Sequence, residues 1–304
     1  MFVCFNKDLA AALRQRNPEE SEAIMNVDKL FRGLVPATVR TPAAPAQVSD
    51  FFRQELPSLV LDAAATLPTE LKYDAIIVDE GQDFSEEQLI ALHDLLRDAA
   101  SQWAFFADWR WDLFRAGKGG AVGADVVFRL HHNCRNTSSV NSATNTYLRQ
   151  HIDSMPGMPA GTPPTVERCP SREAMALRAW ELAKQWDSGN GVVILSPFRL
   201  EHSAMAGSPR GHGLVLTNDI ERFGRPGTVH FSTIRSFKGI EATGVILVDA
   251  DVPSMGSPLT EEDLYVACTR PTARLAVLTT SDQAIQWLAH DAMGSHMHAG
   301  NSGE

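Results

Sequence analysis

Cysteine is scarce in this sequence, and no two cysteines stand in a CxxC pair. The chain holds four cysteines at widely separated positions: Cys4, Cys134, Cys169 and Cys268. CxxC pairs supply zinc ligands and redox thiols, and dense cysteine frameworks belong to small secreted proteins. We therefore expect reduced thiols, as in the cytosol, and neither a disulfide framework nor a metal-thiolate centre.

Long apolar runs and an excess of positive charge are also missing. No apolar run approaches the roughly 18 residues of a membrane-spanning helix, and the N-terminus lacks the basic start and long apolar stretch of a signal peptide. The sequence therefore predicts a cytoplasmic protein with no membrane partner. The formal net charge is -10, so a nucleic acid would have to be bound by a local basic groove and not by the field of the whole molecule.

What the sequence does contain is an alternation of short apolar runs with segments of helical spacing. The 304 residues, 44% of them hydrophobic, suffice for about two domains. Between the apolar runs lie helical patterns for which Ser85 and Ser171 are the predicted N-caps. This alternation predicts an α/β fold with doubly wound parallel sheets. The predicted strands are residues 2–5, 75–79, 103–107, 126–130, 191–195, 228–232, 244–248 and 275–280.

The run IIVDEGQDF, residues 76–84, ends a predicted strand in a cluster of carboxylates. In open α/β sheets, ligands bind beyond the carboxyl ends of the strands, so Asp79, Glu80 and Asp83 are expected to face a binding crevice. An aspartate there can hold Mg²⁺, and an adjacent glutamate can orient and deprotonate a water molecule. The alternative is a solvated acidic turn before a helix capped by Ser85, and this segment alone leaves both interpretations open.

Four other segments accompany this run in a fixed order. They are FVCFNKDLAAAL (2–13), LHHNCRNT (130–137), STIRSFKGIEATGVILV (232–248) and LYVACTRPTARLAVL (264–278). These resemble motifs Ia, IV, V and VI of the UvrD/Rep-like superfamily 1 DNA helicases, and DEGQDF resembles motif II. The resemblance extends to about residue 280, and the short segments between the motifs resemble the compact branch of the family.

The resemblance implies two RecA-like domains, with doubly wound parallel sheets, that hold ATP between them. The first domain, truncated at its N-terminus, would span residues 1–125 and carry motifs Ia, II and III. The second would span residues 126–290 and carry motifs IV, V and VI, and residues 291–304 would form a disordered tail.

The nucleotide contacts that the resemblance implies come from both domains. In the first, Asp79 would bind Mg²⁺, Glu80 would position the hydrolytic water, and Gln82 would sense the nucleotide. In the second, Arg135 and Arg270 would reach the γ-phosphate, because a guanidinium stabilises charge in phosphoryl transfer. For each arginine taken alone, a surface salt bridge is the alternative.

A loop of motif V completes the implied nucleotide site. Glu241 matches the glutamate that bonds the ribose, while Lys238 and Gly239 would hold its loop. The alternative for these residues is an ordinary turn that leads into a strand.

Contacts to single-stranded DNA are implied in motifs Ia and V. They are Asn6, Lys7, Thr233, Arg235 and Ser236. The stretch ADWRWDLFRAGKGG (107–120) also interleaves basic residues with the aromatic Trp109, Trp111 and Phe114, and aromatic rings in a basic groove can stack on bases. The alternative is that the tryptophans pack beneath a loop while the arginines extend outward.

The sequence departs from the family pattern at three places. Trp111 stands where the family has a glutamine that senses the γ-phosphate, and Pro271 is expected to strain or shorten the helix that carries Arg270. No GxxxxGK[ST] phosphate loop occurs. We therefore expect that the first βα unit is absent, that the first sheet lacks a central strand and has unpaired edges, and that an upstream polypeptide supplies the loop.

Two classes of function follow from these observations. The favoured one is an ATP-dependent DNA helicase or translocase of 3′-to-5′ polarity, incomplete and therefore inactive as an isolated chain without a phosphate loop. The alternative is a catalytically inactive, helicase-like remnant or partner subunit that binds nucleic acid or another protein.

Overall fold

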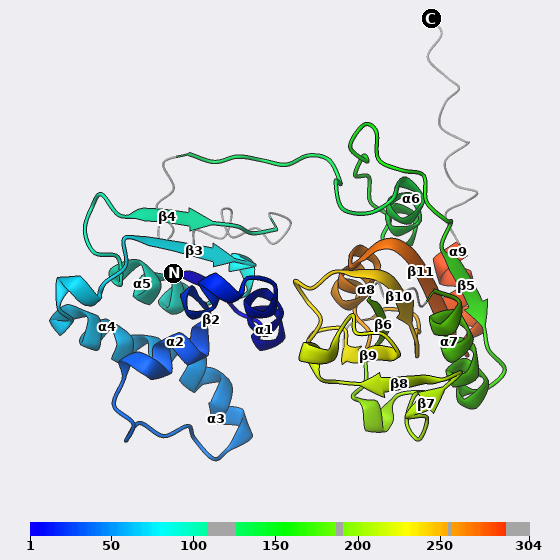
Figure 1. The fold of residues 1–304 in the computed structure, drawn as a ribbon, viewed down its shortest axis with the longest axis horizontal. Coiled ribbons are helices and arrows are strands. Elements are labelled where there is room, and N and C mark those ends of the chain that lie inside the picture. Colours follow the sequence, from blue (N-terminus) through cyan, green and yellow to red (C-terminus); the bar gives the residue numbers. More distant parts are fainter. Residues whose placement is uncertain (109–125, 187–190, 255–256, 290–304) are drawn as a thin grey trace, which may run out of the picture. The chain divides into compact units, whose positions relative to one another are not determined.

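The computed structural model describes residues 1–108, 126–186, 191–254 and 257–289. The chain forms two compact units, Met1–Phe128 (unit 1) and Arg129–Glu304 (unit 2) (Figure 1). Each unit contains a sheet of parallel strands with helices packed on it, so the predicted α/β class is confirmed. Within the described residues, no helix is both long enough and apolar enough to cross a bilayer.

The sheet of unit 1 has the strand order β2-β1-β3-β4, and all of its strands run parallel. β1 is an inner strand that pairs with β2 on one side and with β3 on the other. Val3, Ile76 and Val78 are fully buried, because strands of parallel sheets carry apolar side chains against the helices that cover them. The strands are β1 (Phe2–Cys4), β2 (Ile24–Asn26), β3 (Ala75–Asp79) and β4 (Gln102–Phe105).

The helices of unit 1 pack on this sheet. Figure 1 shows α2, α4 and α5 gathered along the strands, and Phe31, Leu56 and Leu92 are buried in the core that these helices share with the sheet. α5 begins with a capping box in which Ser85 and Gln88 bond each other's backbone amides, so the predicted N-cap at Ser85 is confirmed. The helices are α1 (Lys7–Arg16), α2 (Val27–Leu34), α3 (Pro45–Asp50), α4 (Leu56–Thr66) and α5 (Glu86–Asp94), with 3₁₀ turns at Pro18–Ala23, Thr69–Leu71 and Gly81–Asp83 and a π turn at Phe51–Glu55.

The sequence predicted that the sheet of unit 1 lacks a central strand and has unpaired edges, and the structure agrees with this only in part. β1 and β3 pair directly, with Phe2 opposite Ile77, so the sheet has no gap between them. β4 is an outer strand, and Phe106, just beyond it, is 59% exposed. The prediction of a strand at residues 126–130 is wrong, since this segment has no regular structure and Phe128 is 89% exposed. Its β-prone residues pair with no strand in the described part of the chain and remain exposed, and β-propensity depends chiefly on packing against neighbours.

Unit 2 is built on a larger sheet with the order β5-β11-β10-β6-β9-β8-β7, parallel except between β7 and β8. The strands predicted at 191–195, 228–232, 244–248 and 275–280 are confirmed as β6, β9, β10 and β11, although β11 begins four residues earlier than predicted. The strands β5, β7 and β8 were not predicted. The strands are β5 (Thr165–Arg168), β6 (Val192–Ser196), β7 (Arg210–Gly211), β8 (Leu214–Thr217), β9 (Thr228–Thr233), β10 (Ala242–Leu247) and β11 (Pro271–Thr279).

The helices of unit 2 form two groups. α7 packs against β6, β10 and β11 through buried residues that include Trp180, while α6 packs against α8 and α9 (Figure 1). Ser171 accepts a hydrogen bond from the amide of Ala174 (3.2 Å), as an N-cap of α7 does. The helices are α6 (Ser138–Tyr147), α7 (Arg172–Trp186), α8 (Glu261–Thr269) and α9 (Asp282–Ala289), with 3₁₀ turns at Leu200–His202 and Ile220–Arg222.

Candidate functional site

The carboxyl ends of the parallel strands of unit 1 open on one edge of the sheet. The pairing register places Cys4 opposite both Asn26 and Asp79. Asn6, two residues beyond β1, therefore lies on the same edge as the acidic turn that follows β3. This is the edge at which open α/β sheets bind ligands.

The acidic turn has a defined geometry. Glu80 has a positive φ of 52°, which is uncommon for a residue with a side chain, and its amide donates to the Asp79 carboxylate (3.0 Å). The Gln82 amide group donates to the Glu80 carboxylate and accepts a bond from the amide of Asp108 (3.1 Å). A Cβ on Gly81 would lie 2.1 Å from ring atoms of Phe105. The turn is therefore held against β4, with Gln82 joined to Glu80.

The chemistry of this turn fits a magnesium-bound phosphate. Asp79 and Glu80 are half-buried. Within the described residues, no group of three or more His, Cys, Asp or Glu side chains is placed to hold a metal ion. Mg²⁺ needs only one or two protein carboxylates, because it keeps several waters and takes further ligands from substrate phosphates. Asp79 could supply such a carboxylate.

The residues predicted for DNA in unit 1 lie at the start of α1. Asn6 is the N-cap of this helix, and its side-chain oxygen accepts bonds from the amides of Asp8 (2.8 Å) and Leu9 (3.5 Å). Lys7 is exposed at the first position of the helix. Lys7 thus presents an exposed positive charge at this end, next to the acidic Asp8. Trp109, Trp111 and Phe114 lie outside the described residues.

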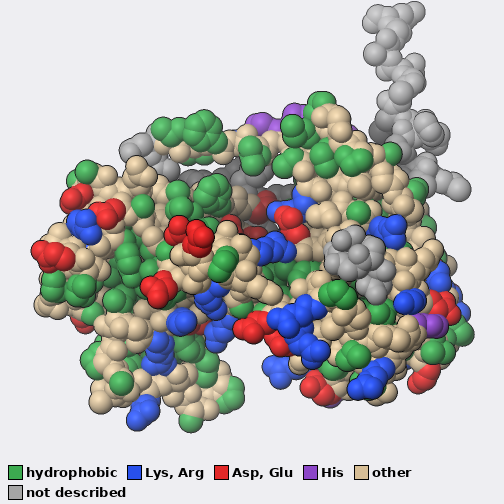
Figure 2. All heavy atoms as spheres, viewed as in Figure 1, with side chains coloured by type: hydrophobic (Ala, Val, Ile, Leu, Met, Phe, Trp, Pro, Cys, Tyr) green, Lys and Arg blue, Asp and Glu red, His purple; other side chains and the backbone are tan. Residues whose placement is uncertain are grey.

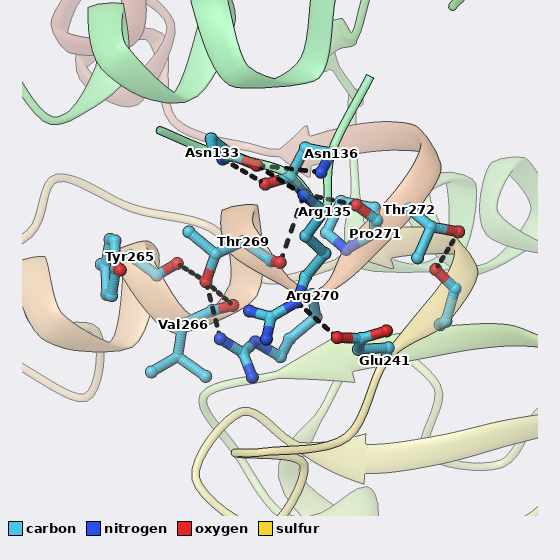
Figure 3. Close-up of polar contacts among 11 residues, drawn as sticks. Asn133, Arg135, Asn136, Glu241, Tyr265, Val266, Thr269, Arg270, Pro271 and Thr272 are labelled. Carbon is cyan, nitrogen blue, oxygen red and sulfur yellow. Dashed lines mark hydrogen bonds and ion pairs between the residues drawn. The ribbon is translucent and has the colours of Figure 1, made fainter. Parts of the chain in front are cut away.

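In unit 2, the fold brings together three residues that were predicted to contact nucleotide. Arg135 donates through Nε to the Glu241 carboxylate, and both side chains are about 40% exposed, at 41% and 39%. Arg270 is 5% exposed and donates through Nη2 to the hydroxyl of Thr269 (3.0 Å). In Figure 3, the guanidinium groups of Arg135 and Arg270 both lie between α8 and Glu241.

Sequence reasoning missed the asparagines around this cluster. Asn133 donates to the side-chain oxygens of Asn136 (2.7 Å) and Asn141 (2.9 Å). The Asn136 side chain in turn donates to the carbonyls of Thr269 (3.2 Å) and Pro271, on either side of Arg270 (Figure 3). The pattern Asn-x-x-Asn around Arg135 was visible in the sequence, but its partners depend on the fold.

α8 ends just before Pro271, the residue that was expected to strain or shorten this helix. The helix stops at Thr269, Arg270 is its C-cap, and Pro271 is the first residue of β11. Proline has no amide hydrogen and cannot continue the helix. Arg270 therefore lies at an abrupt change from helix to strand, with no loop between them.

The loop of motif V is bonded to the beginning of α8. Arg235, predicted to contact DNA, donates through Nε (2.9 Å) and Nη2 (3.2 Å) to the carboxylate of Asp263. The Lys238 ammonium lies 3.6 Å from the Glu262 carboxylate, and Gly239 has a φ of 83°, a conformation that side chains disfavour. These contacts join the loop to the helix whose other end carries Arg270.

The remaining predicted DNA contacts in this loop bond each other. The hydroxyl of Thr233 donates to that of Ser236 (2.9 Å) and accepts a bond from the Ser236 amide (3.2 Å).

Asp263 also forms the capping box of α8 with Thr260. Burial by itself would raise the pKa of Asp263, but the hydrogen bonds from Arg235 and Thr260 outweigh it and hold the pKa below its usual value. Asp263 therefore stays ionised and fixes Arg235 in place.

Comparison with known proteins adds evidence on the fold. No protein-family model matches the sequence, and no curated protein matches it. The L327V variant of S. cerevisiae Dbp5, solved with RNA and ADP BeF3, is 12% identical, with 95% of this chain and 74% of that chain covered and a TM-score of 0.51. This likeness shows a RecA-like fold and confirms the predicted fold class.

Two further structures are similar over shorter stretches. The C-terminal domain of a possible DNA helicase from Lactobacillus plantarum WCFS1 is 21% identical, with 52% of this chain and 92% of that chain covered and a TM-score of 0.39. Arterivirus nonstructural protein 10, a helicase solved with DNA, is 18% identical, with 70% and 41% covered and a TM-score of 0.36.

Proposed function

We propose that the chain is an ATP-dependent helicase- or translocase-like protein of the UvrD/Rep-like type that moves along single-stranded DNA with 3′-to-5′ polarity. The observation that carries the proposal is the cluster of Arg135, Glu241 and Arg270 in unit 2. Arg135 and Glu241 are 106 residues apart in the sequence, and the fold alone brings them into contact. Two guanidinium groups beside a carboxylate suit a ligand that has both phosphates and ribose hydroxyls.

Unit 1 would contribute the metal and water contacts of this reaction. Bound Mg²⁺ would neutralise charge on the phosphates, and Asp79 would hold it. Glu80 would orient the attacking water and accept its proton. Gln82 already donates to the Glu80 carboxylate, so it would keep this base in one orientation and change partner when a phosphate arrives.

Unit 2 would contribute positive charge and nucleoside recognition. Arg135 would exchange its bond to Glu241 for the γ-phosphate, and Glu241 would then be available to accept bonds from the ribose. Because both side chains are about 40% exposed, at 41% and 39%, breaking their ion pair costs little. Arg270 would stabilise charge at the transferring phosphate, while Lys238 and Gly239 hold the Glu241 loop.

Single-stranded DNA would be bound through local groups and not through overall charge. On the face shown in Figure 2, Lys and Arg side chains are interspersed with Asp and Glu. Lys7 in unit 1 and the hydroxyls of Thr233 and Ser236 in unit 2 would contact phosphates. Arg235 would contribute only through groups that its bonds to Asp263 leave available.

A second candidate is an inactive partner subunit that binds nucleic acid or protein. The observation that favours it is the ion pair with Asp263 that is formed by Arg235, a residue predicted to contact DNA. The sequence also holds no GxxxxGK[ST] segment, the loop whose backbone amides grip the α- and β-phosphates. In the favoured function, another polypeptide segment would supply that grip.

A fusion experiment separates the two candidates. A strand, phosphate loop and helix placed ahead of Met1 are expected to give a protein that binds ATP, measured by calorimetry, and releases phosphate. Arg270→Ala should reduce turnover far more than binding, because its contact strengthens as charge develops on the phosphate. Arg274→Ala is the matched control, since this exposed arginine lies on β11, outside the cluster. A folded fusion that binds no ATP would support the inactive partner subunit.

A further inference from the structure

The backbone around Arg270 is bonded at five consecutive carbonyls to other segments of unit 2. The carbonyls of residues 268 to 272 accept in turn from the Thr144 hydroxyl (3.3 Å), the Asn136 side chain (3.2 Å), the Ala242 amide (3.1 Å), the Asn136 side chain again and the Thr137 amide (3.2 Å). Asn136 therefore bonds the residue before Arg270 and the residue after it (Figure 3).

These hydrogen bonds supply donors for the backbone carbonyls at the end of α8, which have no donor within the helix. The last carbonyls of a helix have no intrahelical donor, and Pro271 supplies no amide hydrogen. Asn136 is 1% exposed, so water does not reach the carbonyls that it serves. Loss of its amide would leave buried acceptors without donors, which favours a shift of the backbone that carries Arg270.

The same asparagine is held in a closed turn with Arg135. The backbone amides of Arg135 and Asn136 both donate to the side-chain oxygen of Asn133, each at 3.0 Å. Asn133 donates back to the side chain of Asn136 (2.7 Å). The position of Arg135 is thus tied to the position of Asn136 by three hydrogen bonds within four residues.

We propose that Asn136 is a positioning residue that sets the separation and direction of the Arg135 and Arg270 guanidinium groups. This inference rests on the proposed function, in which both groups contact one phosphate. Asn136 does not touch the ligand itself. It acts through the turn that carries Arg135 and through the carbonyls on both sides of Arg270, so that the two arginines form one preorganised anion site.

The test uses the full chain, labelled with ¹⁵N at arginine, and inorganic pyrophosphate as the probe. Side-chain NMR signals of Arg135 and Arg270 are assigned by substitution and followed during titration. Pyrophosphate should shift both signals with one common affinity in the unaltered chain. Asn136→Ala should weaken this affinity about tenfold, because the two guanidinium groups are then no longer held in one geometry. The two arginines should then respond separately.

The matched control is Asn145→Ala. Asn145 makes the same kind of amide bonds, to the carbonyl (2.9 Å) and the amide (3.2 Å) of Ile152, but touches neither arginine segment. Thermal unfolding of both variants measures the general loss of stability. If Asn136→Ala does not fold, Asn136→Ser, which keeps a smaller donor, is titrated in its place.

The outcomes separate the inference from the function on which it rests. A common affinity that survives in the Asn136 variants, or that falls equally in Asn145→Ala, overturns the positioning role and leaves the proposed function standing. If pyrophosphate shifts neither arginine in the unaltered chain, the arginine pair does not bind phosphate on its own, and the ATP-binding measurement on the fusion protein then decides whether the proposed function fails. Even without pyrophosphate binding, the spectra test the positioning role. If the Arg135 and Arg270 signals of Asn136→Ala equal those of the unaltered chain, the positioning role is overturned, and if both signals differ, it is supported.

Discussion

His230 gives unit 2 a dependence on pH that can be calculated from the structure. It lies on β9, is 3% exposed, and its ring is 5.5 Å from that of Phe223 and 6.0 Å from that of Phe237. Nδ1 is buried and has no hydrogen-bond partner among the residues that the structure describes. Burial lowers the pKa of His230 from 6.5 to about 4, and the negative charge of Asp219 offsets this only in part.

The sign of the effect follows from which state binds the proton. Below pH 6.5 the unfolded chain protonates this histidine, whereas the folded chain does not until the pH approaches 4. The free energy of unfolding therefore falls as the pH falls through this window. Integrating between the two pKa values gives a loss of about 2 kcal/mol by pH 5 and about 3 kcal/mol by pH 4.

Urea unfolding at about pH 7.5 and about pH 5, followed by circular dichroism, measures this loss. His230→Phe keeps an aromatic ring in contact with Phe223 and Phe237 and should remove about 2 kcal/mol of the pH dependence. The control is His151→Phe, since the side chain of His151 is 87% exposed. If the unaltered chain and His230→Phe lose the same stability between the two pH values, the burial argument is refuted.

Other predictions follow from the two units. Gly81→Ala should destabilise unit 1 by about 1–3 kcal/mol in thermal unfolding, because the added Cβ would lie 2.1 Å from the ring of Phe105; adding Phe105→Leu should recover part of the loss, and a neutral Gly81→Ala would contradict this packing. The isolated chain should show negligible DNA-stimulated phosphate release, and robust turnover abolished by Glu80→Gln would overturn this expectation. Binding to a labelled single-stranded oligonucleotide should be weak and salt-sensitive in fluorescence anisotropy, and Trp109→Ala and Trp111→Ala should each cost about 1–3 kcal/mol; no binding even at low salt would count against a DNA role.

The sequence predicted most of the fold where local pattern and tertiary packing agree. The apolar runs at 244–248 and 275–280 became β10 and β11 because they form buried inner strands of the sheet, each with a parallel neighbour on both sides. The run at 126–130 has the same β-prone character and formed no strand. The difference is the presence of a neighbouring strand, which composition does not reveal.

The sequence allowed us to predict which residues belong to the candidate site, but not the hydrogen bonds that hold them. The resemblance of the sequence motifs to those of known helicases implied that Arg135, Glu241 and Arg270 belong to one site, and the fold brings them close. The pairing of Arg235 with Asp263 and the bonds of Asn136 depend on the geometry of turns and helix ends, so no periodicity in the sequence could indicate them. Whether these residues bind nucleotide stays a prediction.

The inner position of β1 has a consequence for the order of events during synthesis. Phe2 pairs with Ile77, so a central strand of unit 1 leaves the ribosome long before the strand that completes its pairing. At translation rates of about 5–20 residues per second, β1 would wait roughly 4 to 15 s for β3. Of the two strands that pair with β1, β2 is already made during that interval, because its residues Ile24–Asn26 follow soon after. The nascent chain therefore carries an apolar strand with one unpaired edge, and this period is when unit 1 would most benefit from a chaperone.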